Sequence, residues 1–148
     1  MSTYKVIYYH LIFGTKNRED TLPEADHRNL YNYMWGVFKN KECHLYQING
    51  TTNHIHFLFE LHPSVTLAGL VKDLKLSTSQ WIKNERKYSN FRGWQVGYGA
   101  FTKCLSEKGR VIQYIKNQKT HHKKVTFLDE YKRLLTENGI DFDEKYLP

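Results

Sequence analysis

Residues 52–60 read TNHIHFLFE, a segment in which apolar residues first alternate with polar ones and then run continuously. This pattern predicts a strand that buries one face fully and the other face in part. Because successive strand side chains point to opposite faces, His54 and His56 share one face, and Ile55 and Phe57 turn toward the core. Two imidazoles about 7 Å apart on a rigid strand can hold a metal ion if a third ligand arrives from elsewhere, or they can be ordinary strand histidines.

The length of the chain favours one domain. Its 148 residues are enough to bury a substantial core and too few for a barrel of eight βα units. The amidohydrolase-type use of a His-x-His pair needs such a barrel, so the length argues against it. We therefore expect a single domain over residues 1–148, with a C-terminal helix and tail from about residue 123.

Cysteine usage and hydropathy bear on the location of the protein. Cys43 and Cys104 lie far apart and lack metal-ligand spacing, which indicates free thiols in a reducing compartment. The N-terminus lacks the basic-then-apolar pattern of a signal peptide, and no apolar run approaches the roughly 20 residues of a membrane span. We expect a cytoplasmic protein without membrane contact.

Charge is distributed unevenly along the chain. The formal net charge is +7, whereas residues 127–148 contain six acids and three bases, so the other 126 residues carry +10. A basic body with a mildly acidic tail favours a polyanionic partner, usually nucleic acid. The alternative is a protein that is basic without such a partner.

Hydrophobic periodicity predicts four strands and four helices. The strands are expected at residues 5–15, 43–49, 54–60 and 95–102, the second and third as a hairpin. The helices are expected at 21–40, 66–86, 106–122 and 127–137, with Thr21 and Ser106 as N-caps. This order predicts an α+β fold: a ferredoxin-like or RRM-like antiparallel sheet with helices packed on one face, plus C-terminal helices. The other sheet face would be open and would expose His54 and His56.

Two pairs of basic residues are candidates for nucleic-acid binding. Lys16 and Arg18 lie in a loop at the end of the first expected strand. Lys72 and Lys75 lie on the polar face of helix 66–86. That helix can dock its apolar face on the sheet and present its basic face to phosphates, or the basic face can simply be solvated.

The helix expected at 106–122 contains the second half of a candidate site. Tyr114 and Gln118 are four residues apart and share a helix face, which places a hydroxyl nucleophile beside an amide carbonyl. Residues 103–124 contain seven bases and one acid, so a nucleotide backbone would be attracted there. The structural alternative for Tyr114 is a tyrosine of the core or its boundary.

The remaining histidines receive no role in the candidate site. His121 and His122 are adjacent and point in different directions on a helix, so they make a poor chelating pair and are expected to face solvent or phosphate. The others are interpreted as ordinary histidines: His10, His27, His44 and His62.

Taken together, these motifs resemble the single-tyrosine HUH transposases of IS-two-hundred-like bacterial insertion sequences. The resemblance rests on the ordered motifs HIH at 54–56, YIKNQ at 114–118 and HH at 121–122. It extends to YHLIFGTK at 9–16, GYGAF at 97–101 and NGIDFDEKYL at 138–147, and so covers nearly the whole chain. Asn17 departs from the pattern, in which an aromatic residue is expected at this position.

The resemblance implies a metal-dependent nuclease and strand transferase for single-stranded DNA. By position, His54, His56 and Gln118 would bind a divalent ion, Mg²⁺ or Mn²⁺. Imidazole ligands suit Mn²⁺ better by softness, and availability can decide which ion is used. Tyr114 would be the nucleophile and would hold the cleaved strand as a 5′-phosphotyrosine, which permits rejoining without ATP.

The resemblance also implies partners. These are DNA hairpins near the ends of the insertion sequence and a second copy of the chain, in a homodimer whose active site can be shared between subunits. Two other functions remain open: a non-catalytic nucleic-acid-binding module with the same sheet, and an HUH replication initiator or relaxase-type nickase. The joint presence of the histidine pair, Tyr114 and Gln118 argues against the first, and a chain of this length argues against the second.

Overall fold

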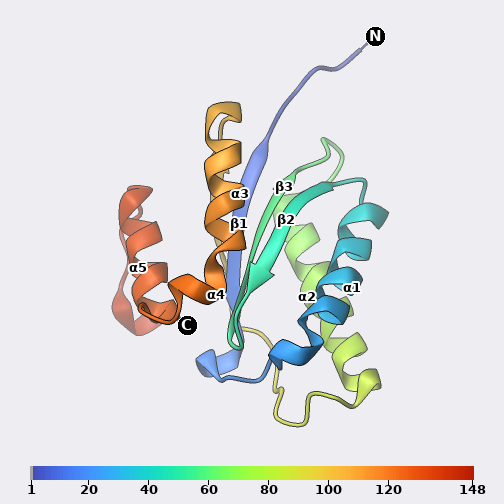
Figure 1. Cartoon of the computed structure of the whole chain (residues 1–148). Coiled ribbons are helices and arrows are strands. Elements are labelled where there is room, and N and C mark those ends of the chain that lie inside the picture. Colours follow the sequence, from blue (N-terminus) through green and yellow to red (C-terminus); the bar gives the residue numbers. More distant parts are fainter. Residues whose placement is uncertain (1) are drawn as a thin grey trace.

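The computed structural model describes residues 2–148, which build a four-stranded antiparallel sheet with helices on both faces (Figure 1). The strands are β1 Tyr8–Gly14, β2 His44–Gly50, β3 His54–Glu60 and β4 Gly99–Lys103, in the spatial order β2-β3-β1-β4. The α-helices are α1 His27–Asn40, α2 Leu67–Glu85, α3 Lys108–Lys116, α4 Gln118–His121 and α5 Phe127–Glu137. Short 3₁₀ turns cover Lys16–Arg18, Glu24–Asp26, Leu105–Glu107 and Glu144–Tyr146. Element types and sheet order confirm the expected α+β, ferredoxin-like class.

Strand register determines which side chains share a face. In the antiparallel β1·β3 pair, Gly14 lies opposite His54 and Ile12 lies opposite His56. Residues paired across two strands point to the same side of the sheet, so both histidines share their face with Ile12. Ile55 and Phe57 point to the other face, as the alternation of the sequence predicts.

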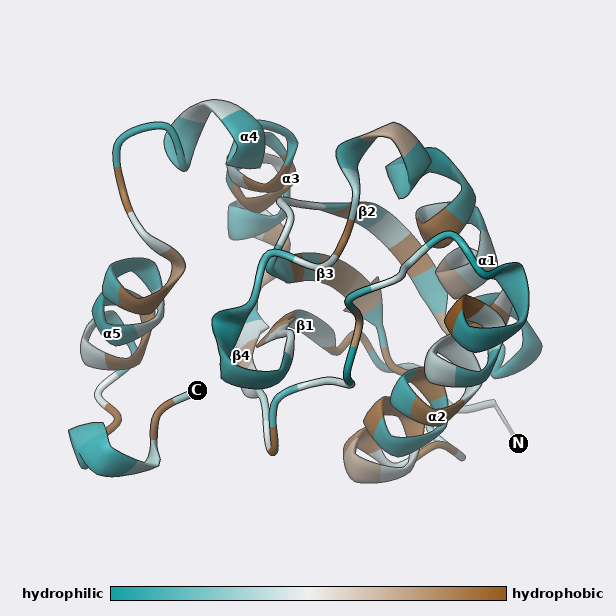
Figure 2. Ribbon diagram, turned by 90° about the horizontal axis from the view of Figure 1, so that it is seen from below, coloured by the Kyte–Doolittle hydropathy of each residue, from teal (hydrophilic) through white to brown (hydrophobic). Residues whose placement is uncertain are grey.

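Helices α1 and α2 cover the face that carries Ile55 and Phe57. The main core forms there, and it includes Leu30 and Phe38 from α1 and Leu74 from α2. Helix α2 begins where Thr66 accepts a hydrogen bond from the Gly69 amide at 3.1 Å, which satisfies an otherwise unpaired helix N–H group. In Figure 2, hydrophobic residues recur at intervals along α1 and α2, as expected for helices that bury one side.

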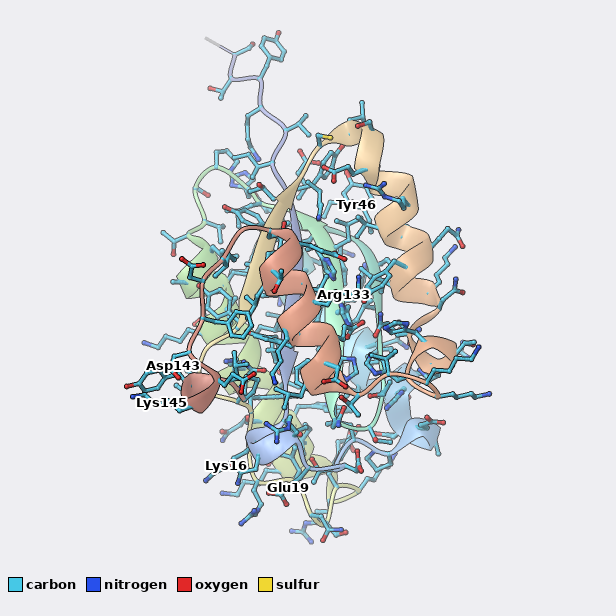
Figure 3. All side chains as sticks on the ribbon, turned by 90° about the vertical axis from the view of Figure 1, so that its left-hand side faces the viewer. Lys16, Glu19, Tyr46, Arg133, Asp143 and Lys145 are labelled. Atoms are coloured by element: carbon cyan, nitrogen blue, oxygen red, sulfur yellow. The ribbon has the colours of Figure 1, made fainter. Side chains whose placement is uncertain are left out.

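The C-terminal helices cover the opposite face. Val111 and Ile115 of α3 pack on Tyr8 and Leu58. The stripe of α5 packs on Ile12 and Phe101; it consists of Phe127, Tyr131, Leu134 and Leu135. Figure 3 shows α5 lying in front of the sheet, with Arg133 between α5 and α3. This second layer buries His54 and His56 completely, so the expectation that both are exposed on an open face is wrong.

Two expected elements begin later than the sequence pattern indicates. The helix expected from Thr21 starts as α1 at His27, because the backbone at Pro23 is not helical, with φ and ψ of −59° and 129°, and a 3₁₀ turn follows at Glu24–Asp26. The amides of Thr21 and Leu22 donate to the carbonyl of Thr52 at 3.0 and 2.9 Å and tie this segment to the connection before β3. The strand expected from Gln95 starts at Gly99, because Gly97 has a φ of +86°, outside the range of strand backbone.

The helix expected at 106–122 is interrupted. It consists of a 3₁₀ turn, then α3 and α4, with a break at Asn117, whose φ and ψ are −90° and 10°. The amide of Asn49 donates to the carbonyls of Ile115 and Lys116 at 3.1 and 3.0 Å and so satisfies the end of α3. Cys104, and not Ser106, occupies the N-cap position of the first turn. Within residues 2–148, no helix has the length and apolarity needed to cross a membrane.

Candidate metal and tyrosine site

Strand β3 holds the two histidines of the candidate site. It pairs with both β1 and β2, so its backbone is fixed on each side. The rings of His54 and His56 lie with their centroids 5.2 Å apart, and both are fully buried. Phe127 stacks on His54 at 4.3 Å with an interplanar angle of 8°, which fixes the plane of that imidazole.

Glu130 of α5 lies at the centre of the site. Its Oε1 atom is 3.3 Å from the Nε2 atom of His54, 2.9 Å from that of His56 and 2.9 Å from that of His122. The Glu130 side chain is fully buried. A carboxylate in such a place requires positively charged or hydrogen-bonding neighbours, since desolvation strongly disfavours an isolated charge.

In His54 and His122, the hydrogen bonds on the side of the ring away from Glu130 determine which ring nitrogen carries the proton. The Nδ1 atom of His122 is 2.6 Å from the carbonyl of Val125, which can only accept, so Nδ1 carries the hydrogen. The Nδ1 atom of His54 is 2.8 Å from Asn53 Oδ1 and therefore also donates. In the neutral rings, both Nε2 lone pairs then face the carboxylate of Glu130. Electron pairs that converge in this way are satisfied by a cation between them.

Burial favours the neutral form of His54. Desolvation is the largest cause that lowers its pKa, to about 4, and repulsion from His56 and His122 acts in the same direction. For Glu130, burial by itself would raise the pKa. Interaction with His56 and the close approach of the His122, His54 and His56 rings outweigh burial and hold this pKa well below its usual range. The neutral imidazole of His54 beside the ionised carboxylate of Glu130 gives a pair of donors that fits a divalent metal ion.

Tyr114 of α3 contacts the same carboxylate. Its hydroxyl donates to Glu130 Oε2 and accepts a hydrogen bond from the guanidinium of Arg133 at 2.7 Å. Its ring centroid lies 5.7 Å from that of His56. Burial first, and then the charge of Glu130, raise the pKa of Tyr114 well above its ordinary value, while Arg133 opposes this shift. The phenol is therefore protonated in this arrangement.

Gln118 reaches the cluster although the helix breaks before it. Its Oε1 atom lies 3.2 Å from His54 Nε2, and its amide nitrogen donates to Glu130 Oε2 at 3.0 Å. The structure thus brings the four predicted catalytic and metal-binding residues together in a single chain: His54, His56, Tyr114 and Gln118. Tyr114 therefore lies beside the histidine pair of the same chain.

Three histidines that sequence reasoning left aside also lie at this cluster. His121 was expected to face solvent or phosphate, but its Nε2 atom is 3.5 Å from Glu130 Oε2. His122 was expected to face solvent or phosphate, but its ring contacts Glu130 and its side chain is only 8% exposed. His10 was interpreted as ordinary, yet its Nε2 atom lies 2.8 Å from His56 Nδ1. Burial and the neighbouring His56 lower the pKa of His10 well below its usual value. His10 therefore positions the ring of His56 from behind.

A family model described as Transposase IS200 like matches residues 3–118. The chain belongs to this family. No curated protein matches it.

Two solved structures share the fold of this IS200-like transposase. A Deinococcus radiodurans R1 protein described as a transposase is 22% identical, with a TM-score of 0.63 over 80% of this chain and 95% of that chain. A REP-associated tyrosine transposase bound to a REP hairpin is 14% identical, with a TM-score of 0.63 over 84% of this chain and 76% of that chain. At these identities, the likeness is one of fold.

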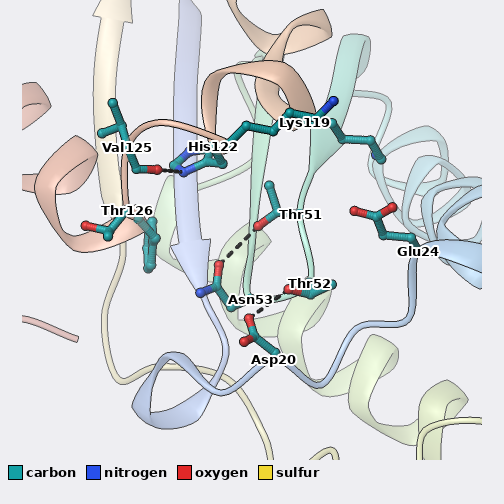
Figure 4. Close-up of a pocket in the computed structure, with 11 residues that line it drawn as sticks. Asp20, Glu24, Thr51, Thr52, Asn53, Lys119, His122, Val125 and Thr126 are labelled. Atoms are coloured by element: carbon teal, nitrogen blue, oxygen red, sulfur yellow. Dashed lines mark hydrogen bonds between the residues drawn. The ribbon is translucent and has the colours of Figure 1, made fainter.

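A hollow of about 540 Å³ opens beside the histidine cluster of the transposase (Figure 4). Asn53, Lys119, Lys123 and His122 contribute to its lining. The hydroxyl of Thr51 donates to Asn53 Oδ1 at 3.1 Å and helps to hold the Asn53 side chain in place. Asp20 and Glu24 also line the hollow, so basic, acidic and neutral polar groups lie beside the buried site.

The basic residues named from the sequence lie on different sides of the transposase. Lys16 and Arg18 are exposed in the turn after β1, at the end of the sheet where His54 begins. Asn17 between them has a φ of 57°, a conformation that asparagine adopts more readily than an aromatic residue does. Lys72 is exposed on α2, which covers the opposite face of the sheet. Lys75 is partly buried, and its ammonium donates to the carbonyls of Gln95 and Gly97 at 2.9 and 2.6 Å.

Sequence reasoning did not identify Glu130 or Arg133 as residues of the site. A signal for Glu130 was present, because it lies three residues after Phe127 and four before Leu134 and therefore falls on the apolar stripe of α5. Acids are seldom buried unless they are paired. No comparable pattern distinguishes Arg133, which reaches Tyr114 through the packing of α5 against α3.

Proposed function

We propose that this transposase cleaves and rejoins single-stranded DNA at insertion-sequence ends, with Tyr114 as nucleophile and a divalent metal ion held by His54, His56 and Gln118. One observation supports this most strongly: the Tyr114 hydroxyl and the Nε2 atoms of both histidines converge on the carboxylate of Glu130. A binding module without chemistry needs no such convergence of nucleophile and ligands.

The residues of the site divide the proposed work. Tyr114 attacks the phosphorus, and Arg133, which donates to its oxygen, stabilises the negative charge that forms as the phenol loses its proton. His10 holds His56 in position from the other side of its ring. A bound divalent ion supplies polarisation of the scissile phosphate and neutralisation of its charge.

The proposed step exchanges one phosphodiester for another. The phenolic oxygen forms a bond to phosphorus while the bond from phosphorus to the 3′ oxygen breaks, and the proton of the phenol balances the charge of the 3′ oxygen. The products are a 5′-phosphotyrosine and a free 3′-hydroxyl. Attack of a 3′-hydroxyl on this linkage reverses the exchange, so rejoining requires no nucleotide cofactor.

The proposed partner is single-stranded DNA with hairpin ends. Support comes from the charge of +10 outside residues 127–148 and from the fold shared with a transposase bound to a REP hairpin. Lys16 and Arg18 are proposed contacts near the site, whereas Lys72 and Lys75 would serve a strand that continues to the far face of the sheet. We further propose one domain over residues 1–148, a cytoplasmic location and a homodimer.

The test is covalent capture of DNA. Labelled single-stranded oligonucleotides from the DNA that flanks the gene are incubated with the protein and Mn²⁺ or Mg²⁺, then resolved on denaturing gels. We expect a protein–DNA adduct that Tyr114→Phe abolishes and that a chelator suppresses. Tyr33→Phe is the matched control, because Tyr33 lies on α1 and stacks on Trp81 away from the site. Binding without an adduct would favour the non-catalytic module, and an adduct in Tyr114→Phe would move the nucleophile elsewhere.

A further inference from the structure

We infer that Glu130 and His122 are further ligands of the same ion, so that three imidazoles and one carboxylate surround it beside Gln118, and that this site selects Mn²⁺ over Mg²⁺. This inference rests on the metal site of the proposed function. It adds two donors from the C-terminal segment that the motifs His54-Ile55-His56 and Tyr114 to Gln118 do not contain.

The spacing of the donor atoms matches a filled coordination sphere. One ligand atom from each of His54, His56, His122 and Glu130 lies within 4.8 Å of all the others. The carboxylate Oε1 atom is 2.9–3.3 Å from the three Nε2 atoms. Around an ion bonded at about 2.2 Å, neighbouring ligands at right angles are about 3 Å apart. The four atoms therefore require little movement to enclose a cation.

A structural ion-pair cluster accounts for this arrangement less well. Such a cluster would place N–H groups of the imidazoles toward Glu130. In the neutral rings of His122 and His54, the single N–H group is at Nδ1 and is committed to Val125 and Asn53 on the other side of each ring. Donation to Glu130 as well would require a second proton, and therefore a positive charge, on each of these buried rings. The amide oxygen of Gln118 also points at His54 Nε2 and so adds an acceptor rather than a donor.

The chemistry of the donors determines the choice of ion. Mg²⁺ prefers oxygen ligands in near-ideal octahedral geometry and retains several waters, which three imidazoles in a buried site do not allow. Mn²⁺ accepts both carboxylate and imidazole and binds nitrogen-containing sites more tightly. With only two imidazoles and water as ligands, the availability of each ion would decide between Mn²⁺ and Mg²⁺. The imidazole of His122, as a third nitrogen ligand, shifts the preference toward Mn²⁺.

The test measures metal binding directly, without DNA. The full chain is stripped by prolonged dialysis against EDTA and titrated with Mn²⁺, and free Mn²⁺ is followed by its electron paramagnetic resonance signal. We expect one bound Mn²⁺ ion per chain, and an excess of Mg²⁺ of about hundredfold should not displace it. Glu130→Gln and His122→Asn should each weaken Mn²⁺ binding by at least about tenfold. Asp129→Asn and His44→Asn, at exposed positions, are the matched controls and should bind as the wild type does.

Pulsed electron paramagnetic resonance gives a second readout, because the hyperfine coupling between bound Mn²⁺ and ligand nitrogens reports how many imidazoles coordinate the ion. We expect three imidazole nitrogens in the wild type and two in His122→Asn, and circular dichroism verifies that each variant is folded. Three results would overturn the inference and leave the proposed function intact. They are an unchanged Mn²⁺ affinity in Glu130→Gln, only two coordinating nitrogens in the wild type, and displacement of bound Mn²⁺ by Mg²⁺. A wild type that binds no ion, and whose DNA adduct survives chelation, would overturn the proposed metal dependence as well.

Discussion

At the scale of single residues, the site is a set of polar groups that depend on one another within a buried space. Glu130 contacts the hydroxyl of Tyr114 with one oxygen and the imidazoles of His54, His56 and His122 with the other. Arg133 adds a charged donor to the Tyr114 hydroxyl. A change at any of these positions leaves a buried partner unsatisfied, so the effects of two changes should be far from additive.

Arg133 should affect the reaction rate without being a nucleophile or a ligand. Arg133→Gln removes the guanidinium whose Nη2 atom lies 2.7 Å from the Tyr114 oxygen. We expect the initial rate of adduct formation to fall on the order of 10- to 100-fold, since a charged donor to the developing oxyanion is lost. Arg110→Gln is the control, because the Arg110 side chain is 79% exposed on α3. Equal rates in the two variants would show that Arg133 does not assist Tyr114.

At the scale of elements, the docking of α5 depends on the absence of a side chain in β1. A Cβ atom at Gly14 would lie 2.5 Å from a ring carbon of Phe127 and 3.0 Å from the carbonyl oxygen of Asn53. Gly14→Ala should therefore push α5 from the sheet and lower the free energy of unfolding by about 1–3 kcal/mol. Urea denaturation measures this change.

A matched glycine on the other face provides the control for Gly14→Ala. Gly36 lies within α1, and a Cβ atom there would meet nothing within 4 Å. Gly36→Ala should raise stability by about 0.5–1 kcal/mol, because alanine loses less conformational freedom in a helix. If Gly14→Ala were as stable as the wild type, α5 would not be seated on β1 as described.

Helices and strands were predictable wherever the local pattern of hydrophobic residues determines them. The alternation in residues 54–60 predicts β3 and its two faces, and the amphipathic pattern of 127–137 predicts α5 with its observed bounds. The expected helix from Thr21 begins later because the backbone at Pro23 is not helical and the preceding residues are tied to Thr52, a partner distant in sequence. The position of Glu130 among three imidazoles likewise depends on how α5 packs. Periodicity shows which side of α5 is buried, but not which residues that side contacts.

At the scale of the whole molecule, the buried cluster ties stability to pH. Burial lowers the pKa of His54 to about 4, below its ordinary value of 6.5. Between these values, the unfolded chain binds a proton at this position and the folded chain does not. Without metal, the free energy of unfolding should therefore decrease as pH falls from 6.5 to 4, by at most about 1.4 kcal/mol per pH unit for this residue.

Chemical denaturation in EDTA across this pH window tests the sign and the origin of the effect. His54→Asn should show a shallower dependence on pH than the wild type, because the proton difference at residue 54 is removed. His44→Asn, which alters an exposed histidine of β2, should retain the full dependence. Identical slopes for the wild type and His54→Asn would assign the pH sensitivity to other groups.

The flat contact between Phe127 and His54 has a consequence for how long a metal would stay. An imidazole pressed against an aromatic ring cannot turn aside, so the ligand shell is preorganised and its closure orders few side chains. Escape would instead require the whole C-terminal helix to lift, which is a slow local opening. An ion once enclosed should survive dilution and purification, and isolated protein would then report the metal it met in the cell.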